Sequence, residues 1–383
     1  MKDRQMKTET AEEVPVPEGG YTEQEYLYWL CQAPAFGTVK IHRLWEHYGS
    51  FRDIYYIEGK ELEEEKLVSG RDAETFDSHK GKLGETILEY RSLESQGIRF
   101  VSVLDDEYPR RLAYISSKPM GLYIKGRLPD EARPTLAIIG ARGCSSYGRQ
   151  VAEYMGAALS KHGIQIISGL AAGIDGAGHR GAIREGQPTY GILGCGVNIC
   201  YPREHYPLYE SMKTCGGILS EYRLDETPIP GNFPQRNRII SGLSDAILVV
   251  EAREKSGSLI TVEYALEQGK EVFAIPGPIT EDLSRGCNRL IKAGAGLVSS
   301  PEDILDFFNV KYKKMLTVHE KNTNSLAKNE KMLYSCLDFK PKFIEEIVAM
   351  SGLSIGACTT ALLEMELEGY VVQPASHYYA RKI

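Results

Sequence analysis

The 383-residue sequence lacks the features that mark several protein classes. Its eight cysteines form no CxxC pair and have no histidine at zinc-ligand spacing, so reduced thiols are expected instead of a disulfide scaffold or a metal site. No apolar run approaches the roughly 18 residues that a membrane span requires. The charged N-terminus also lacks the apolar core of a signal peptide. We therefore expect a cytoplasmic protein with no membrane partner.

An excess of basic charge is also missing. The formal net charge is −7, so a nucleic-acid site would have to be a local cluster of cations and not a basic shell. The content of 42% hydrophobic and 25% charged residues is ordinary for a globular protein. A chain of this length has room for two or three domains, each with its own core.

The central stretch, residues 136–179, has the pattern of a strand, a glycine turn, a helix and a second strand. Such a βαβ unit places its ligands at the carboxyl ends of the parallel strands. The glycines at 140, 143 and 148 do not form a GxGxxG motif, and Ser168-Gly169 stands where an acidic residue would hold a ribose. The pattern argues against a dinucleotide cofactor and favours a site for bare phosphate.

The remaining pattern predicts an α/β protein with an extended Rossmann-like, doubly wound sheet between a small helical domain and a winged-helix-like domain. Apolar runs predict core strands at 136–139, 164–167, 189–193, 217–220, 246–250 and 271–275. Runs at 98–104 and 120–125 are expected to extend this sheet. The predicted units are a disordered tail (1–20), the helical domain (21–96), the Rossmann-like domain (97–308), a linker (309–328) and the winged-helix-like domain (329–383).

The helical domain carries two local signals. Thr22 and Glu25 have the spacing of a capping box at the start of the first helix. A glycine turn at Gly37, followed by Lys40, is typical of a helix-hairpin-helix that points backbone N–H groups at DNA phosphate. The segment is acidic overall, so an ordinary turn in a helical domain is an equally good interpretation.

Three stretches have residues suited to phosphate. Gly140-Ala141-Arg142 combines close backbone approach with a guanidinium, and the N-terminus of the helix that follows is expected to add partial positive charge for a phosphate. A packing turn would explain the glycine but not the arginine. In 231–238, Phe233 and the arginines that follow pair a stacking ring with charge, as single-stranded nucleic acid requires. A solvated helix start explains 231–238 equally well. In 254–261, serine and glycine at a helix start form an anion nest or a simple N-cap.

Two other groups of residues favour structural or protein-contact roles. Asp175 and His179 are spaced i,i+4, but no serine or cysteine nucleophile is placed to complete a triad, and Asp175 is better explained as a helix cap. In the C-terminal domain the third helix is predicted over 354–368. It carries three glutamates, at 364, 366 and 368, which disfavour insertion into a major groove and favour contact with a protein.

Taken together, the motifs resemble the DNA-processing protein A (DprA/Smf) family. Those that carry the resemblance are Gly140–Arg142, Ser168–Asp175, Tyr201-Pro202, Leu219–Tyr222, Phe233–Ile240, Ser256–Thr261 and Ile275–Gly277, in family order. The sequence departs from the family pattern at two positions, and both departures are mild. Ala141 stands where serine is common, and Gly178 stands where alanine is usual. The flanking helical and winged-helix-like domains resemble the family's architecture as well.

The resemblance implies a non-enzymatic protein without cofactor, metal or catalytic residue. It implies sequence-independent binding of single-stranded DNA by a homodimer that loads the RecA recombinase onto incoming DNA in natural transformation. The implied DNA contacts are Gly140, Ala141, Arg142, Ser168, Gly169, Phe233, Arg236, Asn237, Arg238, Lys255, Ser256, Gly257, Ser258 and Thr261. The dimer patch is expected on the helices at 259–266 and 290–291.

Two other classes of function remain as alternatives. Ser256 to Glu263 loosely echoes the helix start of Rossmann-like nucleotide phosphoribohydrolases, but the PGGxGT run that those enzymes need is absent. A winged-helix repressor is disfavoured by the acidic third helix. Release of free base from AMP would support the first alternative, and a footprint on a defined duplex would support the second.

Overall fold

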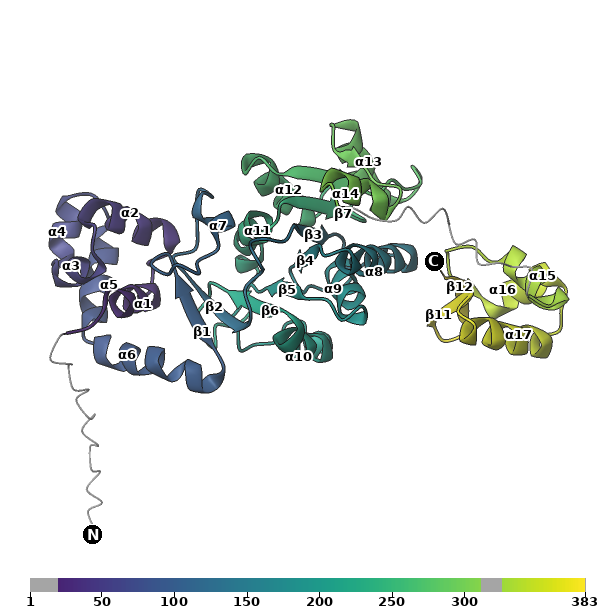
Figure 1. Cartoon of the computed structure of the whole chain (residues 1–383), viewed down its shortest axis with the longest axis horizontal. Coiled ribbons are helices and arrows are strands. Elements are labelled where there is room, and N and C mark those ends of the chain that lie inside the picture. The colour runs from purple at the N-terminus through teal and green to yellow at the C-terminus, as the bar shows by residue number, and fades with distance from the viewer. Residues whose placement is uncertain (1–19, 311–325, 383) are drawn as a thin grey trace, which may run out of the picture.

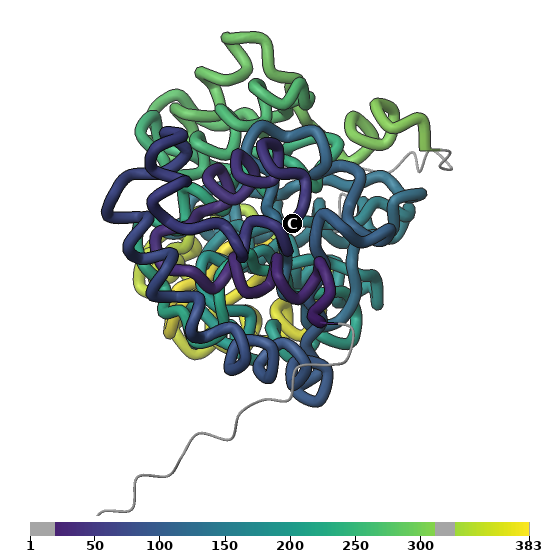
Figure 2. The backbone as a smooth tube through the Cα atoms, turned by 90° about the vertical axis from the view of Figure 1, so that its left-hand side faces the viewer, coloured from purple at the N-terminus to yellow at the C-terminus, as the bar shows by residue number. Residues whose placement is uncertain are grey.

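The computed structural model describes residues 20–310 and 326–382, which form three successive units (Figure 1). The N-terminal helices and the C-terminal module lie at opposite ends of a central α/β domain. Figure 2, turned by 90°, shows the N-terminal helices in front of the rest of the chain. Almost all of the predicted tail and most of the predicted linker lie outside the described residues, so those assignments stay predictions.

Six short helices build the N-terminal unit. They are α1 (Glu23–Gln32), α2 (Thr38–Tyr48), α3 (Phe51–Tyr56), α4 (Gly59–Glu64), α5 (Gly70–Lys80) and α6 (Leu83–Ser92), followed by a 3-10 turn at Glu94–Gln96. The predicted capping box is present, since the Thr22 hydroxyl accepts from the Glu25 N–H and the Glu25 carboxylate accepts from the Thr22 N–H. Trp29, Phe51 and Phe76 are fully buried and anchor a separate apolar core.

The central unit contains a nine-stranded sheet in the order β1-β2-β6-β5-β4-β3-β7-β8-β9. The strands are β1 (Arg99–Ser102), β2 (Gly121–Gly126), β3 (Thr135–Ile139), β4 (Gln165–Ser168), β5 (Thr189–Ile192), β6 (Gly217–Ser220), β7 (Ala246–Val249), β8 (Glu271–Ala274) and β9 (Gly296–Leu297). The strands from β3 onward pair in parallel with their neighbours, whereas β1 and β2 pair antiparallel and extend the β6 edge. The extended doubly wound sheet expected from the sequence is confirmed.

Helices cover both faces of this sheet. One face carries α8 (Ser146–Lys161), α9 (Ile174–Arg184), α10 (Tyr206–Cys215), preceded by a 3-10 turn at Arg203–His205, and α14 (Pro301–Phe307). The other carries α7 (Arg110–Ala113), α11 (Asn232–Leu243), α12 (Ser258–Glu267) and α13 (Asp282–Lys292). Strand β3 shows why the core strands are apolar at every position: Leu136 and Ile138 pack on one layer, Ala137 and Ile139 on the other.

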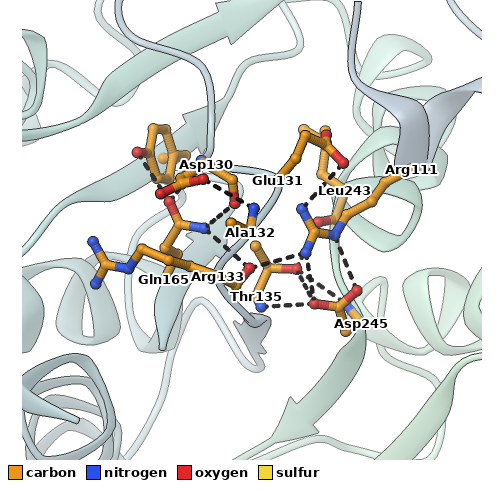
Figure 3. Close-up of polar contacts among 10 residues, drawn as sticks. Arg111, Asp130, Glu131, Ala132, Arg133, Thr135, Gln165, Leu243 and Asp245 are labelled. Atoms are coloured by element: carbon orange, nitrogen blue, oxygen red, sulfur yellow. Dashed lines mark hydrogen bonds and ion pairs between the residues drawn. The ribbon is translucent and has the colours of Figure 1, made fainter. Parts of the chain in front are cut away.

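A hydrogen-bonded network closes the amino ends of β3, β4 and β7 (Figure 3). The Arg111 guanidinium donates from Nε to Asp245 Oδ1 at 3.0 Å and from Nη2 to Oδ2 at 3.1 Å. The same carboxylate accepts from the Thr135 N–H at 2.8 Å. Nearby, the Gln165 side chain both accepts from the Asp130 N–H at 2.8 Å and donates to its carbonyl at 2.9 Å. We call this group the amino-edge network.

The C-terminal module has three helices and a small sheet in the order β10-β12-β11, a winged-helix arrangement. Its elements are α15 (Lys328–Cys336), β10 (Lys342–Phe343), α16 (Ile344–Ser351), α17 (Ile355–Leu367), β11 (Val371–Ala375) and β12 (Tyr378–Arg381). The helix predicted over 354–368 is α17. The module touches the α/β domain through Phe339 on the Tyr147 ring, at 5.9 Å between centroids, and through an ion pair from Lys340 to Glu281.

Two absences bear on function. Among the described residues no single helix is long and apolar enough to cross a membrane, and only the bent pair α16–α17 reaches the required length and hydropathy together. The same residues contain no group of three or more His, Cys, Asp or Glu side chains that could hold a metal ion. All eight cysteines are free thiols.

Candidate nucleic-acid interface

A cleft opens where β3 and β7 end, at the point where the chain turns toward opposite halves of the sheet. Doubly wound sheets bind their ligands at this switch point. The cleft has a volume of about 570 Å³. It is lined by the turn after β3, the start of α9, the N-terminal half of α11 and the segment 253–261 that leads into α12. We call it the carboxyl-edge cleft.

The turn after β3 contributes one charged side chain, that of Arg142. Gly140 is required by packing, because an added Cβ would lie 2.7 Å from the Ile174 side chain and 2.8 Å from the Glu251 carbonyl. The Ala141 N–H already donates to that carbonyl at 2.8 Å, so it is not available to a phosphate. Arg142 lies at the mouth of the cleft, where its guanidinium can reach a ligand.

The N-terminus of α8 is closed by a protein carboxylate. Glu251 is 7% exposed and accepts from the Ser145 N–H at 2.8 Å and from the Ser145 hydroxyl at 2.5 Å. Ser145 in turn caps the helix through the Gly148 N–H. The expectation that this helix start would receive a phosphate is therefore wrong: Glu251 already satisfies the donors there, and its negative charge repels an anion.

Ser168 and Gly169 lie behind the cleft and do not line it. Ser168 is fully buried, and its hydroxyl donates to the Ile138 carbonyl at 2.6 Å. The Gly169 N–H donates to Asp175 Oδ2 at 3.0 Å. The prediction of direct phosphate contact is at odds with this geometry, because the Ser168 hydroxyl and the Gly169 N–H both have internal partners.

Arg236 supports the floor of the cleft from below. Only 3% exposed, it donates to the Gly169 carbonyl at 2.8 Å and to the Ile192 carbonyl. Burial lowers the pKa of Arg236 to about 10, with the Asp175 charge opposing the shift, so the guanidinium stays positive at neutral pH. Burial likewise raises the pKa of Asp175, and Arg236 acts against that rise. Asp175 thus tethers the turn after β4, rather than capping α9, whose N-cap is Gly173.

Phe233 lies in the cleft with cations on its ring. The Arg142 guanidinium carbon is 5.1 Å from the ring centroid, the Arg236 carbon is 6.0 Å away, and the Tyr201 ring is 5.5 Å away. Phe233 is half-buried, so it is available at the surface of the cleft and does not belong to the apolar core. The helix start at α11 therefore presents an aromatic plane next to positive charge, the pairing that stacked bases require.

Arg238 points to the other side of α11. Its guanidinium donates to both oxygens of Glu221, at 2.6 and 2.5 Å, and to the Ser117 carbonyl at 2.7 Å. It lines a separate pocket of about 320 Å³ against the N-terminal helices. The prediction that Arg238 supplies charge to the DNA is corrected, because Glu221 neutralises it. Asn237, one residue earlier, does line the cleft and contacts the Gly257 carbonyl at 3.4 Å.

The start of α12 faces the cleft without a side-chain cap. Gly257 is the N-cap and provides no side-chain acceptor, while the Ser256 and Ser258 hydroxyls bond each other at 2.8 Å. Thr261 is 2% exposed and forms part of the wall. Lys255 is exposed at the rim. The positive end of the helix dipole, the two hydroxyls and the lysine together favour an anion.

Sequence reasoning missed Arg253, which is exposed and lines the cleft. Arg253 belongs to none of the motifs. It follows the carboxyl end of β7, however, and a charged residue at that position could have been predicted to reach the ligand site. Pro228, Pro230 and Tyr201 were also missed as lining residues. Pro228 and Pro230 stand directly before the 231–238 stretch and Tyr201 lies in one of the family motifs, but none of the three carries a charge that would mark it as a phosphate contact.

The cleft is locally positive although the protein is acidic overall. Arg142, Arg253 and Lys255 have no ion pair with any carboxylate in the described ranges 20–310 and 326–382. Within those ranges, the one carboxylate that lines the cleft is Asp175, which lies beside Arg236. Three uncompensated cations in a cleft that also presents an aromatic ring can bind phosphates and a base without any further charge.

Comparison with known proteins shows which family has this sequence and fold. Residues 99–309 match the family model of DNA recombination-mediator protein A, and residues 319–375 match that of the DprA winged helix domain. The chain belongs to the DprA/Smf family. It is 36% identical to protein Smf of Escherichia coli over 292 residues, which cover 75% of this chain and 78% of that protein.

Solved structures of the family agree with this assignment. The X-ray structure of DprA from Streptococcus pneumoniae superimposes with a TM-score of 0.66 and 34% identity, covering 76% of this chain and 99% of that one. A structure of DNA processing protein A from Helicobacter pylori, described for its single-stranded DNA binding mode, has a TM-score of 0.51 and 28% identity. It covers 56% of this chain and 97% of its own. The family and the fold class predicted from the sequence are confirmed.

Proposed function

We propose that this protein binds single-stranded DNA without sequence preference in the carboxyl-edge cleft. The observation that carries the proposal is the set of cations without carboxylate partners in the described chain, Arg142, Arg253 and Lys255, which line the same cleft as the Phe233 ring. Phosphate contacts give affinity without sequence information, and a stacked base adds about 1–3 kcal/mol whatever its identity. The H. pylori relative, whose structure concerns single-stranded DNA binding, supports the same ligand class.

The proposal includes a dimer, because one cleft is small for the task. One single-strand-binding fold covers roughly 4–16 nucleotides, and so few phosphate contacts bind weakly at cellular salt. Two clefts on one strand make the second contact intramolecular. Within the helices suggested for the interface, Leu266 is 65% exposed, whereas Leu259, Leu290 and Ile291 are partly covered by the core. We expect dimers in sedimentation, and we expect enforced monomers to bind long strands more weakly by a factor of at least about ten.

DNA processing during natural transformation, with loading of the RecA recombinase on the bound strand, is the cellular role that we propose. Family membership supports the DNA-processing part of this role. Loading of RecA is tested by strand-exchange assays on DNA coated with single-strand-binding protein, in which the protein should shorten the lag. An unchanged lag at saturating protein contradicts it.

We also propose that the cleft carries no catalytic activity. His179 is fully buried, and Asp175 is engaged by Gly169 and Arg236, so neither is free to act on a substrate. Glu251 closes the start of α8, so a nucleotide phosphate cannot be held at that helix start. Incubation of the protein with AMP should release no free base. Release that scales with protein concentration and persists through purification would support the phosphoribohydrolase alternative.

The binding proposal is tested by titrating a labelled oligothymidine at low salt. Arg142→Ala should bind about tenfold more weakly than the wild type, since a charge-assisted contact contributes about 1.5–3 kcal/mol. Arg110→Ala is the matched control, because Arg110 is an exposed arginine on α7 outside the cleft. Duplex DNA should compete poorly. Equal binding by the wild type and Arg142→Ala means that the site is assigned to the wrong place.

A further inference from the structure

Helix α17 of the C-terminal module carries an exposed apolar ridge that the DNA proposal does not use. Leu363 and Leu367 are 55% and 80% exposed, and their i,i+4 spacing puts them side by side along the helix. The opposite face, with Cys358, Leu362 and Met365, is fully buried in the core of the module. Leu363 and Leu367 form what we call the α17 ridge.

Carboxylates flank the ridge on both sides. Glu364 and Glu368 follow it at the next helical positions and are exposed, and their carboxylates have no hydrogen-bond or ion-pair partner within the described part of the chain. On the other flank, half-buried Glu366 accepts from the Gln373 N–H at 3.3 Å. Residues 344–368, which span α16 and α17, contain no lysine or arginine. The surface is therefore an apolar seam with acidic borders.

Three cations of the module are engaged away from the ridge. Lys342 pairs with Asp338 at 2.6 Å, and Lys340 pairs with Glu281 of the α/β domain. Arg381 donates to the Tyr334 carbonyl. The contacts to the α/β domain come from the strand side of the module, and in Figure 1 the β11–β12 hairpin lies nearest α8 while α17 lies farther out. Docking of the module on the α/β domain thus leaves the α17 ridge open.

We propose that the α17 ridge docks an amphipathic helix of a partner protein, one whose apolar stripe is bordered by lysine or arginine. Two leucines at i,i+4 on one exposed helix face form the kind of apolar seam along which two helices pair as in a coiled-coil zipper, and the acidic borders select a basic partner. DNA is excluded as an occupant by the like charge of Glu364 and Glu368. A second copy of the same face would bring these carboxylates together, so self-pairing is disfavoured. This inference goes beyond DNA binding and does not depend on it.

The experiment uses the full chain and a designed probe. The probe is a labelled amphipathic peptide of about 18 residues, roughly five helical turns, with leucine on one face and lysine on its borders. A companion peptide carries glutamate in place of lysine. The lysine peptide should bind and the glutamate peptide should not. Methyl NMR signals of Leu363 and Leu367 should shift on binding.

Variants separate the ridge from general charge attraction. The double variant Leu363→Ser/Leu367→Ser keeps every charge and should bind the lysine peptide about tenfold more weakly, since the apolar area that the two leucines would bury is lost. Glu364→Gln/Glu368→Gln should weaken binding a few-fold and reduce its salt dependence. Leu88→Ser is the matched control, because Leu88 is 52% exposed on α6. Both ridge residues are exposed, so the variants should fold, which an unchanged melting temperature verifies.

Four outcomes overturn the proposal. Equal peptide binding by the wild type and the double leucine variant shows that charge alone attracts the peptide. Equal binding of the lysine and glutamate peptides shows that the acidic borders select nothing. A change in sedimentation of the double leucine variant shows that the ridge serves self-association. Wild-type binding to phosphatidylcholine vesicles that the double variant loses, without peptide binding, shows that the bent α16–α17 pair serves a lipid surface.

Discussion

Both edges of the central sheet carry arginine side chains, but the arginine charge is neutralised at the amino edge, whereas Arg142 at the carboxyl edge has no carboxylate partner in the described part of the chain. At the amino edge, Arg111 is tied to Asp245 and to the Arg133 carbonyl, so its positive charge is neutralised within the protein (Figure 3). At the carboxyl edge, within the described residues, Arg142 has only the Phe233 ring as a partner, and Lys255 has none. The two edges therefore differ in whether a positive charge is available to a ligand, and not in whether an arginine is present.

A second contrast lies along α11, between two engaged arginines that serve different parts of the protein. Arg238 is closed by Glu221, whereas Arg236 faces the cleft floor and is held by carbonyl oxygens near Asp175. A motif that contains both arginines therefore mixes a structural residue with one that supports the site. The variants described next test whether the buried polar residues stabilise the fold and whether the cleft residues bind DNA.

The largest expected effect is on stability, from Arg236→Met. The substitution removes the hydrogen bonds to the Gly169 and Ile192 carbonyls and leaves the buried Asp175 without its counter-charge. We expect the free energy of unfolding to fall by about 3–5 kcal/mol in urea titrations. Adding Asp175→Asn should recover part of the loss, with a coupling of about 0.5–3 kcal/mol. Strictly additive single and double variants would mean that the two side chains do not interact.

The second effect is a pH dependence caused by His179. The Thr189 hydroxyl donates to the Ile166 carbonyl, so it accepts from His179 Nδ1, and Nε2 has no partner among the described residues. Burial lowers the pKa of His179 to about 3, and neighbouring His205 and Arg180 add to the shift. In the unfolded chain a histidine titrates near 6.5, so between these values the unfolded state binds more protons and stability falls as the pH falls.

The expected slope is about 1.4 kcal/mol per pH unit as the pH is lowered from about 6 to 4. His179→Gln should lose this contribution, and His162→Gln, at an exposed position, should retain it. The measurement is the free energy of unfolding against pH for the three proteins. If the free energy of unfolding has the same pH slope in the wild type and in His179→Gln, the imidazole of His179 is not buried and neutral as described.

A smaller effect concerns the stacking plane. Phe233→Ala should weaken oligothymidine binding by about 1–2 kcal/mol, because a stacked base loses its platform and Arg142 loses its ring neighbour. Tyr114→Ala is the control, since Tyr114 is an aromatic residue, 93% exposed, that follows α7. Fluorescence anisotropy gives both affinities. A loss of equal size in the two variants would mean that exposed rings contribute without regard to the cleft.

The sheet was predictable because its strands are continuous apolar runs, and Val249 or Ile139 is recognised as buried without knowledge of its neighbours. Phe233 and Arg142 could be predicted to line the cleft, because each has a side chain suited to nucleic acid and stands within a few residues of a predicted strand end or helix start. The errors at Arg238 and at the α8 helix start share one cause. The carboxylates Glu221 and Glu251 are separated along the chain from Arg238 and from the start of α8, which they engage, and no local pattern reveals such contacts.

The most direct test of the central claim is the salt dependence of oligothymidine binding by Arg142→Ala and Arg110→Ala. Removing one cation that binds a phosphate should reduce the slope of log K against log salt by about 0.7 for a single strand. Arg142→Ala is expected to show this reduction, whereas Arg110→Ala should keep the wild-type slope because Arg110 lies outside the cleft. A wild-type slope for Arg142→Ala, or an equal reduction in both variants, would contradict the assignment of phosphate binding to the carboxyl-edge cleft.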